Sequence, residues 1–136
     1  MQKRSRQREA ILTFLQQRKD HPTADMIFQG VKDEIPNLSP GTVYRNLKLL
    51  EEAGTIQRIS IGDSADHYDG DASPHYHFYC KKCGSLTDFP MPVLSDLNVL
   101  AAHRFSGSID GHSVHFYGTC PKCMPYSDKE DPFIQE

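Results

Sequence analysis

The sequence predicts an α+β fold in which an N-terminal winged helix-turn-helix is followed by a small α/β domain. Three observations support this prediction: helical hydrophobic periodicity over roughly the first fifty residues, strand-like alternation after them, and two Cys-x-x-Cys pairs in the second half. The chain has 136 residues, enough for one ordinary domain or two very small ones. It has no run of about eighteen apolar residues and no signal-like opening segment, so we expect a cytoplasmic protein without a membrane partner.

The first two predicted helices are separated by His21 and Pro22, where helical hydrogen bonding is interrupted. The first covers 4–18, and the second follows Thr23, whose hydroxyl can cap a helix N-terminus. In both helices the apolar residues recur at the spacing of one buried face. They are Ala10, Ile11, Phe14 and Leu15 in the first helix and Ile27, Phe28 and Val31 in the second.

The third predicted helix has Ser39 as its N-cap and Pro40 as its first residue, since the N–H that proline lacks would be unsatisfied there. Its apolar stripe consists of Val43, Leu47 and Leu50. Gly54 ends the helix, 56–61 alternates as a strand, and 66–68 can pair back as a hairpin. Three helices followed by a hairpin make a winged helix-turn-helix.

The second half has a different periodicity, and a short polar segment with Gly and Pro precedes it. The predicted elements there are strands at 77–80 and 85–89, a helix at 92–103, and strands at 105–109 and 114–119 around an Asp-Gly turn. The domain prediction is a winged-helix domain at 1–68, a hinge at 69–74, a second domain at 75–124 and a flexible tail at 125–136.

Charge is distributed unevenly between the two halves. Residues 1–58 hold ten Lys and Arg against seven Asp and Glu, whereas 59–136 hold five against eleven, so the net charges are +3 and −6. A basic module next to an acidic one suggests that the basic module binds phosphate groups of a partner. Two ordinary faces of one fold would explain the same asymmetry.

The two Cys-x-x-Cys pairs predict a structural zinc site. Each pair, Cys80 with Cys83 and Cys120 with Cys123, can present two sulfurs from one tight turn, and two such turns complete a tetrahedral shell. The alternative is a pair of disulfides or redox-active dithiols. A reducing cytosol argues against it.

His75 and His77 suggest a second metal site. Alternate residues of a strand point to the same side, so both imidazoles can reach one ion. Asp88 lies on the expected partner strand, and Asp69 and His21 lie in or near the linking segments. Surface histidines on a polar strand are the alternative. The other histidines are expected to be solvated or hydrogen-bonded, and these are His67, His103, His112 and His115.

The predicted third helix is the candidate recognition helix, because the start of the second helix of such a motif enters the major groove of DNA. Arg45 can reach a guanine edge and Tyr44 a thymine methyl group. The other expected contacts are Thr42 and Lys48 on this helix, and Lys3, Arg4, Arg6 and Arg8 toward phosphates. A merely solvated basic face is the alternative.

Taken together, these motifs resemble the ferric uptake regulator family of metal-dependent bacterial repressors. The resemblance runs from Arg6 to Cys123 and includes HPTAD from His21, TVYRNL from Thr42 and HYHFYC from His75. It implies a homodimer that binds double-stranded operator DNA, with a C-terminal dimerisation domain held by zinc on the four cysteines.

Within this family the chain is most similar to the peroxide-responsive branch, whose regulatory site uses three histidines and two aspartates. The resemblance assigns these ligands to His21, Asp69, His75, His77 and Asp88. The iron-responsive branch usually has glutamate at the two carboxylate positions. The bound ion would be Fe(II) or Mn(II), which suit mixed nitrogen and oxygen ligands.

The expected function is a repressor that senses peroxide through Fe(II)-catalysed oxidation of His21 and His75. The expected small ligands are only metal ions and peroxide, and the chain is not expected to be an enzyme. Two alternatives stay open at this point: an iron-responsive repressor with the same fold, and a non-haem iron enzyme built on a His/Asp triad.

Overall fold

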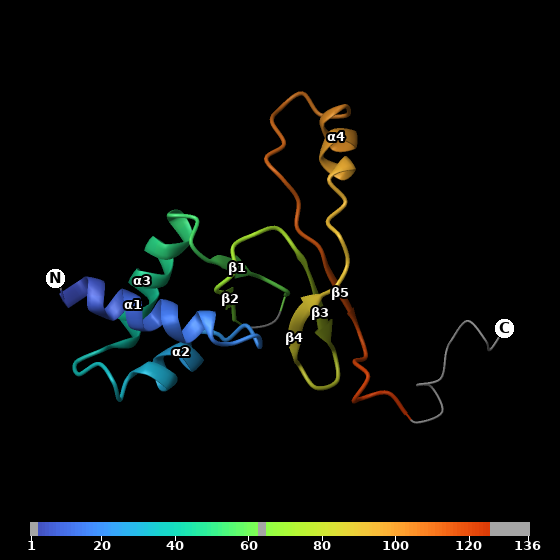
Figure 1. Ribbon diagram of the computed structural model, residues 1–136. Coiled ribbons are helices and arrows are strands. Elements are labelled where there is room, and N and C mark those ends of the chain that lie inside the picture. Colours follow the sequence, from blue (N-terminus) through green and yellow to red (C-terminus); the bar gives the residue numbers. More distant parts are fainter. Residues whose placement is uncertain (1–2, 63–64, 126–136) are drawn as a thin grey trace. The chain divides into compact units, whose positions relative to one another are not determined.

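The computed structural model describes residues 3–62 and 65–125, and it has the mixed α+β fold that the sequence predicts (Figure 1). The chain divides into two compact units, the N-terminal unit Met1–Ser73 and the C-terminal unit Pro74–Glu136. Each unit has its own sheet. None of the helices within the described ranges is long and apolar enough to cross a membrane.

Three helices form the core of the N-terminal unit: α1 (Lys3–Gln16), α2 (Ala24–Val31) and α3 (Pro40–Glu52). The hydroxyl oxygen of Thr23 accepts the Met26 N–H, and local capping of this kind starts α2 at the predicted place. The helices bury the apolar stripes expected from the sequence. The most enclosed of these residues are Ile11, Leu15, Ile27, Val31, Val43 and Leu47. Removal of this apolar surface from water is the main stabilising contribution to the unit.

A two-stranded antiparallel sheet completes the N-terminal unit. It consists of β1 (Gln57–Ile59) and β2 (His67–Asp69). β1 is shorter than the predicted strand at 56–61, and β2 is displaced by one residue from the predicted strand at 66–68. The strand β2 is buried along its whole length. Part of the predicted turn, 63–64, lies outside the described residues.

The C-terminal unit is built on a three-stranded sheet with the order β4-β3-β5. The central strand β3 (Tyr76–Cys80) pairs antiparallel with β4 (Leu86–Phe89) and parallel with β5 (His115–Gly118). A short helix, α4 (Asp96–Ala102), lies between β4 and β5 in the chain. Figure 1 shows α4 at the end of a long excursion away from the sheet.

Two sequence predictions for this unit are wrong. The predicted strand at 105–109 is not formed, and the predicted helix at 92–103 begins only at Asp96. β5 pairs with β3 in a parallel ladder and is an edge strand of this sheet, and 105–109 forms no ladder with it in the described part of the chain. Pairing between distant segments overrides the local pattern here. All but the first residue of the predicted tail at 125–136 lies outside the described residues.

Candidate metal centres and nucleic-acid interface

Two tight turns bring the four cysteines together. The first follows β3, where the Cys80 carbonyl oxygen accepts the Gly84 N–H at 2.9 Å and Gly84 has a φ of 78°, a left-handed conformation that glycine adopts without strain. The second follows β5, where the Cys120 carbonyl oxygen accepts the Cys123 N–H at 3.0 Å. Because β3 and β5 are parallel neighbours, both turns emerge at the same end of the sheet.

The sulfur positions fit a tetrahedral zinc ion. The four Sγ atoms all lie within 4.8 Å of one another, and the Cys83 and Cys120 sulfurs are 3.8 Å apart. With zinc–sulfur bonds of about 2.3 Å, the edge of a tetrahedron is also about 3.8 Å. A disulfide would require about 2.05 Å, and all four thiols are free. The cluster therefore has the donor atoms and the dimensions of a Cys₄ zinc site.

Backbone N–H groups already favour a thiolate in this cluster. Hydrogen bonds from the N–H groups of Cys83 and Cys120 lower the pKa of Cys80 to about 6. The Ser85 hydroxyl, 3.2 Å from Cys83 Sγ, likewise lowers the pKa of Cys83. Cys123 shows the opposite behaviour, since its hydrogen bond with Cys120, together with desolvation, raises its pKa to about 12. A bound cation would remove the protons outright, because a coordinating thiol is deprotonated.

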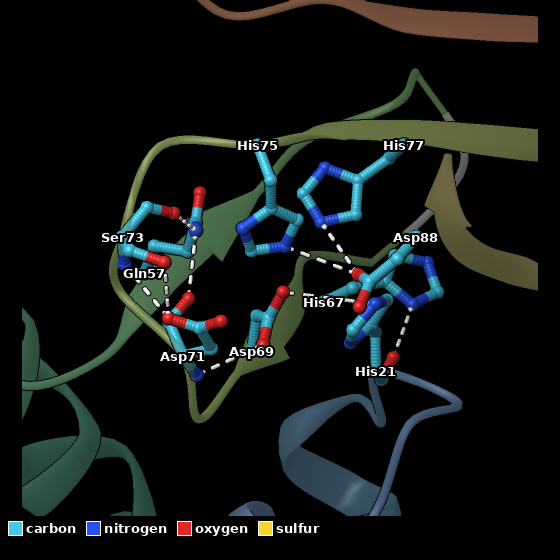
Figure 2. Close-up of polar contacts among 9 residues, drawn as sticks. All are labelled: His21, Gln57, His67, Asp69, Asp71, Ser73, His75, His77 and Asp88. Carbon is cyan, nitrogen blue, oxygen red and sulfur yellow. Dashed lines mark hydrogen bonds and ion pairs between the residues drawn. The ribbon is translucent and has the colours of Figure 1, made fainter. Parts of the chain in front are cut away.

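The C-terminal unit also assembles His75, His77 and Asp88 (Figure 2). His77 on β3 is directly opposite Asp88 on β4, and Nε2 of His77 lies 3.6 Å from Asp88 Oδ1. His75 precedes β3 and places its Nε2 atom 3.1 Å from the same oxygen. The two imidazole rings are 4.5 Å apart between centroids. Two nitrogens and one carboxylate oxygen therefore converge as a three-donor group.

The N-terminal unit holds a second group of donors, His21 and Asp69 (Figure 2). His21 Nε2 is 3.6 Å from Asp69 Oδ2, and both side chains are buried, with exposed fractions of 2% and 5%. The other oxygen of Asp69 accepts the N–H of Asp71 at 2.9 Å, which fixes the orientation of the carboxylate. Donor atoms at this separation can bind the same ion at metal–ligand distances of about 2.1 Å.

The segment between these two groups of donors is fastened to the N-terminal unit up to Ser73. The Gln57 side chain on β1 donates to the carbonyl oxygens of Asp71 and Ser73 at 2.8 and 3.2 Å (Figure 2). The Asp71 carboxylate accepts both the N–H and the hydroxyl of Ser73. Most of the segment predicted as a hinge therefore has a defined local structure.

The exposed face of α3 carries polar and aromatic side chains. Tyr44 is 58% exposed, Arg45 and Lys48 are exposed, and the residues between them are buried in the helical core. Arg45 donates from its guanidinium to the Thr42 hydroxyl at 3.0 Å, and the Ser39 and Thr42 hydroxyls are 2.9 Å apart. This chain of hydrogen bonds orients the guanidinium before any partner arrives.

Arg6 and Arg8 on α1 have different surroundings, although the sequence suggested the same role for both. Arg6 is exposed, whereas Arg8 is partly buried and donates from Nε to Asn46 Oδ1 at 3.1 Å. Asn46 in turn donates to the Thr42 carbonyl oxygen at 2.9 Å. Arg8 thus connects α1 to α3. The side chains of Lys3 and Arg4 lie outside the described residues.

Sequence reasoning assigned no specific role to two polar residues, although it expected His67 to be solvated or hydrogen-bonded. Asn46 is 3% exposed and contacts Arg8, and its position inside the Val43/Leu47 stripe could have indicated burial. His67 is 9% exposed, and its Nδ1 atom lies 3.0 Å from the His21 carbonyl oxygen. Its position two residues before Asp69 was the available signal, because alternate residues of a strand point to the same side.

Comparison with known proteins gives consistent results for most of the chain. A family model described as "Ferric uptake regulator family" matches residues 2–117. The peroxide-responsive repressor PerR of Staphylococcus aureus strain USA300 is 37% identical over 118 residues, covering 87% of this chain and 80% of that protein.

Solved structures show the same similarity. The Campylobacter jejuni peroxide stress regulator has a TM-score of 0.76 at 31% identity, covering 89% of this chain and 91% of that one. The Francisella tularensis ferric uptake regulator, solved with iron, has a TM-score of 0.68 at 28% identity, covering 85% and 89%. Both a peroxide regulator and an iron regulator are therefore similar to this chain.

Proposed function

Because the chain belongs to the ferric uptake regulator family and is a metal-responsive regulator, we propose that it is a repressor that senses peroxide and binds operator DNA as a homodimer. The observation that carries this proposal is the chemistry of the histidine-rich groups. In each unit the carboxylate beside the imidazole nitrogens belongs to an aspartate, Asp69 in one and Asp88 in the other. The similar repressor from Staphylococcus aureus carries the peroxide-responsive name.

Zinc on the four cysteines would have a structural role. It would join the turn after β3 to the turn after β5, and so close one end of the small sheet of the C-terminal unit. A sheet with so few buried apolar residues gains much of its stability from such a metal, because ion binding is coupled to folding. We infer that this unit is also the dimerisation domain.

The regulatory ion would use five protein ligands: His21, Asp69, His75, His77 and Asp88. Their nitrogen and oxygen atoms suit Fe(II) or Mn(II), and five protein donors would leave at most one coordination position open. The ligands come from both units, so binding would favour one orientation of the DNA-binding unit relative to the dimer. Two recognition helices held in this way would match two operator half-sites.

DNA recognition would use the exposed face of α3. Arg45 and Tyr44 would read base edges, with Thr42 and Lys48 beside them. Arg6 would contact phosphates, and so would the terminal guanidinium nitrogens of Arg8, whose Nε is bound to Asn46. The hydrogen bond between Arg45 and Thr42 supports this role, because an oriented guanidinium loses less conformational entropy on binding. A DNA partner also places the protein in the cytoplasm.

Peroxide sensing follows from the open position. Bound Fe(II) would supply the redox chemistry that cleaves the O–O bond of hydrogen peroxide. In the net reaction one ring C–H of His21 or His75 becomes C–OH while H₂O₂ is reduced to water, so the imidazole loses two electrons, the peroxide gains two, and the iron shows no net change of oxidation state. An oxidised imidazole is a poorer ligand, so the DNA-binding unit would be released.

Peptide mass mapping after low peroxide tests this function and separates it from the iron-responsive alternative. Protein loaded with Fe(II) should gain one oxygen atom on His21 or His75, whereas protein loaded with Mn(II) should stay unmodified. Oxidation confined to cysteines, or equal with both ions, would reject peroxide sensing through histidine and favour the iron-responsive repressor. The third alternative, a non-haem iron enzyme, has no support among the similar proteins, which are regulators.

A further inference from the structure

His67 is a buried histidine with a defined hydrogen-bond partner in the N-terminal unit. It lies on β2, is 9% exposed, and places Nδ1 3.0 Å from the carbonyl oxygen of His21 (Figure 2). A carbonyl oxygen only accepts hydrogen bonds, so Nδ1 of His67 carries the hydrogen and donates it. The contact therefore fixes which ring nitrogen of His67 is protonated.

The backbone of His21 is in a conformation that needs such support. Its φ is 51°, in the left-handed region that side-chain-bearing residues rarely adopt. Residues held there persist only where surrounding contacts determine the conformation. The neighbouring carbonyl is held as well, since Pro22 O accepts the N–H of Tyr68 at 2.9 Å. Two consecutive carbonyls, those of His21 and Pro22, are thus bound by two consecutive residues of β2.

The same strand also approaches the imidazole of His21. His67 and Asp69 are two residues apart on β2, so their side chains point to the same face of the strand. His67 contacts the backbone carbonyl of His21, and Asp69 Oδ2 lies 3.6 Å from its Nε2 atom. One strand face therefore holds His21 at both its backbone and its ring.

We propose that His67 is a positioning residue, whose hydrogen bond to the His21 carbonyl aims the His21 imidazole at the regulatory metal ion. This inference rests on the proposed function, because it requires that His21 binds that ion. His67 itself is not a ligand in the proposal. Loss of its N–H would leave the left-handed backbone of His21 free to relax, and the imidazole would turn away from Asp69.

Two substitutions separate the hydrogen bond from the volume of the side chain. His67→Asn keeps an N–H donor near the position of Nδ1, whereas His67→Leu has similar bulk and no donor. In zinc-loaded protein, we expect His67→Leu to weaken Mn(II) binding by roughly 10–100-fold, as is typical for partners that orient a metal ligand. His67→Asn should recover most of the affinity. Mn(II) electron paramagnetic resonance, which detects the free ion, measures both.

A core variant controls for a general loss of stability. Leu50 is 5% exposed in the helical core on α3, so Leu50→Ala should lower the melting temperature of the protein. We expect its Mn(II) affinity to stay within a few-fold of wild type. If Leu50→Ala weakened Mn(II) binding as much as His67→Leu at a comparable melting temperature, His67 would be merely structural and the inference would be overturned.

Nuclear magnetic resonance provides a readout without the regulatory ion. In zinc-loaded protein, nitrogen-15 spectra of the histidine rings should show His67 with its hydrogen on Nδ1, and the ring signals of His21 should shift in His67→Leu but much less in His67→Asn. A His67 ring protonated only on Nε2 would overturn the inference. Wild-type protein that binds no Mn(II) or Fe(II) would overturn the proposed function and this inference together, whereas equal binding by wild type and His67→Leu would overturn the inference alone.

Discussion

His77 and Asp88 lie directly opposite each other on β3 and β4, with His77 Nε2 3.6 Å from Asp88 Oδ1. This antiparallel register, rather than proximity in sequence, brings the carboxylate to the two imidazoles of the His-x-His pair. The Asp88 side chain is 45% exposed, so the carboxylate can move toward an ion without disturbing a packed core. A substitution that changes only the length of this side chain therefore tests whether Asp88 belongs to the proposed metal site.

Asp88→Glu should keep metal binding but lose most of the peroxide response. Glutamate is one methylene longer than aspartate, so its carboxylate would reach a different point relative to the imidazoles of His75 and His77. The arrangement of ligands around the bound ion, next to the open position, would change as a result. Fe(II) titration should show affinity close to wild type, while mass mapping after low peroxide should show little oxygen on His21 and His75. Asp96→Glu, the same change in α4, is the matched control and should respond as wild type does.

Cys83→Ser should release zinc and destabilise the C-terminal unit. The substitution opens the four-sulfur shell, and the loss of coupled binding free energy should amount to several kcal/mol. Zinc content by atomic absorption and thermal unfolding measure the effect. Ser85→Ala removes only the hydroxyl that contacts Cys83 and should retain zinc. A Cys83→Ser protein with unchanged melting temperature would show that the cluster has no structural role.

Arg45→Ala should weaken operator binding by roughly 1–3 kcal/mol and relax base preference, because Arg45 would read a base edge. Arg45→Lys keeps the charge but not the planar pair of donors, so it should lose base preference with an almost unchanged salt dependence. Arg6→Ala, in contrast, should weaken binding to all DNA sequences alike and reduce the dependence of the binding constant on salt concentration. Fluorescence anisotropy with specific and random DNA at several salt concentrations distinguishes the three variants.

Metal and DNA should increase each other's affinity by the same factor, since thermodynamic linkage is reciprocal. Mn(II) affinity measured with and without operator DNA, and DNA affinity with and without Mn(II), tests this in the wild type. His21→Ala should retain zinc and lose the coupling. His21→Asn should behave in the same way, although asparagine tolerates the left-handed backbone found there. Equal DNA affinity with and without Mn(II) in the wild type would contradict metal control of DNA binding.

Local patterns in the sequence were sufficient to predict the helical core and the two cysteine turns. Ser39 starts α3 through its hydroxyl, Thr23 starts α2 in the same way, and Gly54 follows α3 with a φ of 77°. These features depend on residues only a few positions apart, and so does the geometry of each Cys-x-x-Cys turn. The spacing of His75 and His77 likewise predicts that they share one side of a strand.

Only the tertiary structure decided how distant segments pair. The parallel ladder of β3 with β5 replaced the expected hairpin at 105–119 and placed both cysteine turns at one end of the sheet. The tertiary structure also pairs β2 with the loop before α2, where His67 contacts the carbonyl oxygen of His21, whose backbone is in the left-handed region. Hydrogen bonds of these kinds join residues tens of positions apart, and their formation depends on the whole packed unit. No local periodicity in the sequence encodes which partner a strand or a buried histidine will find.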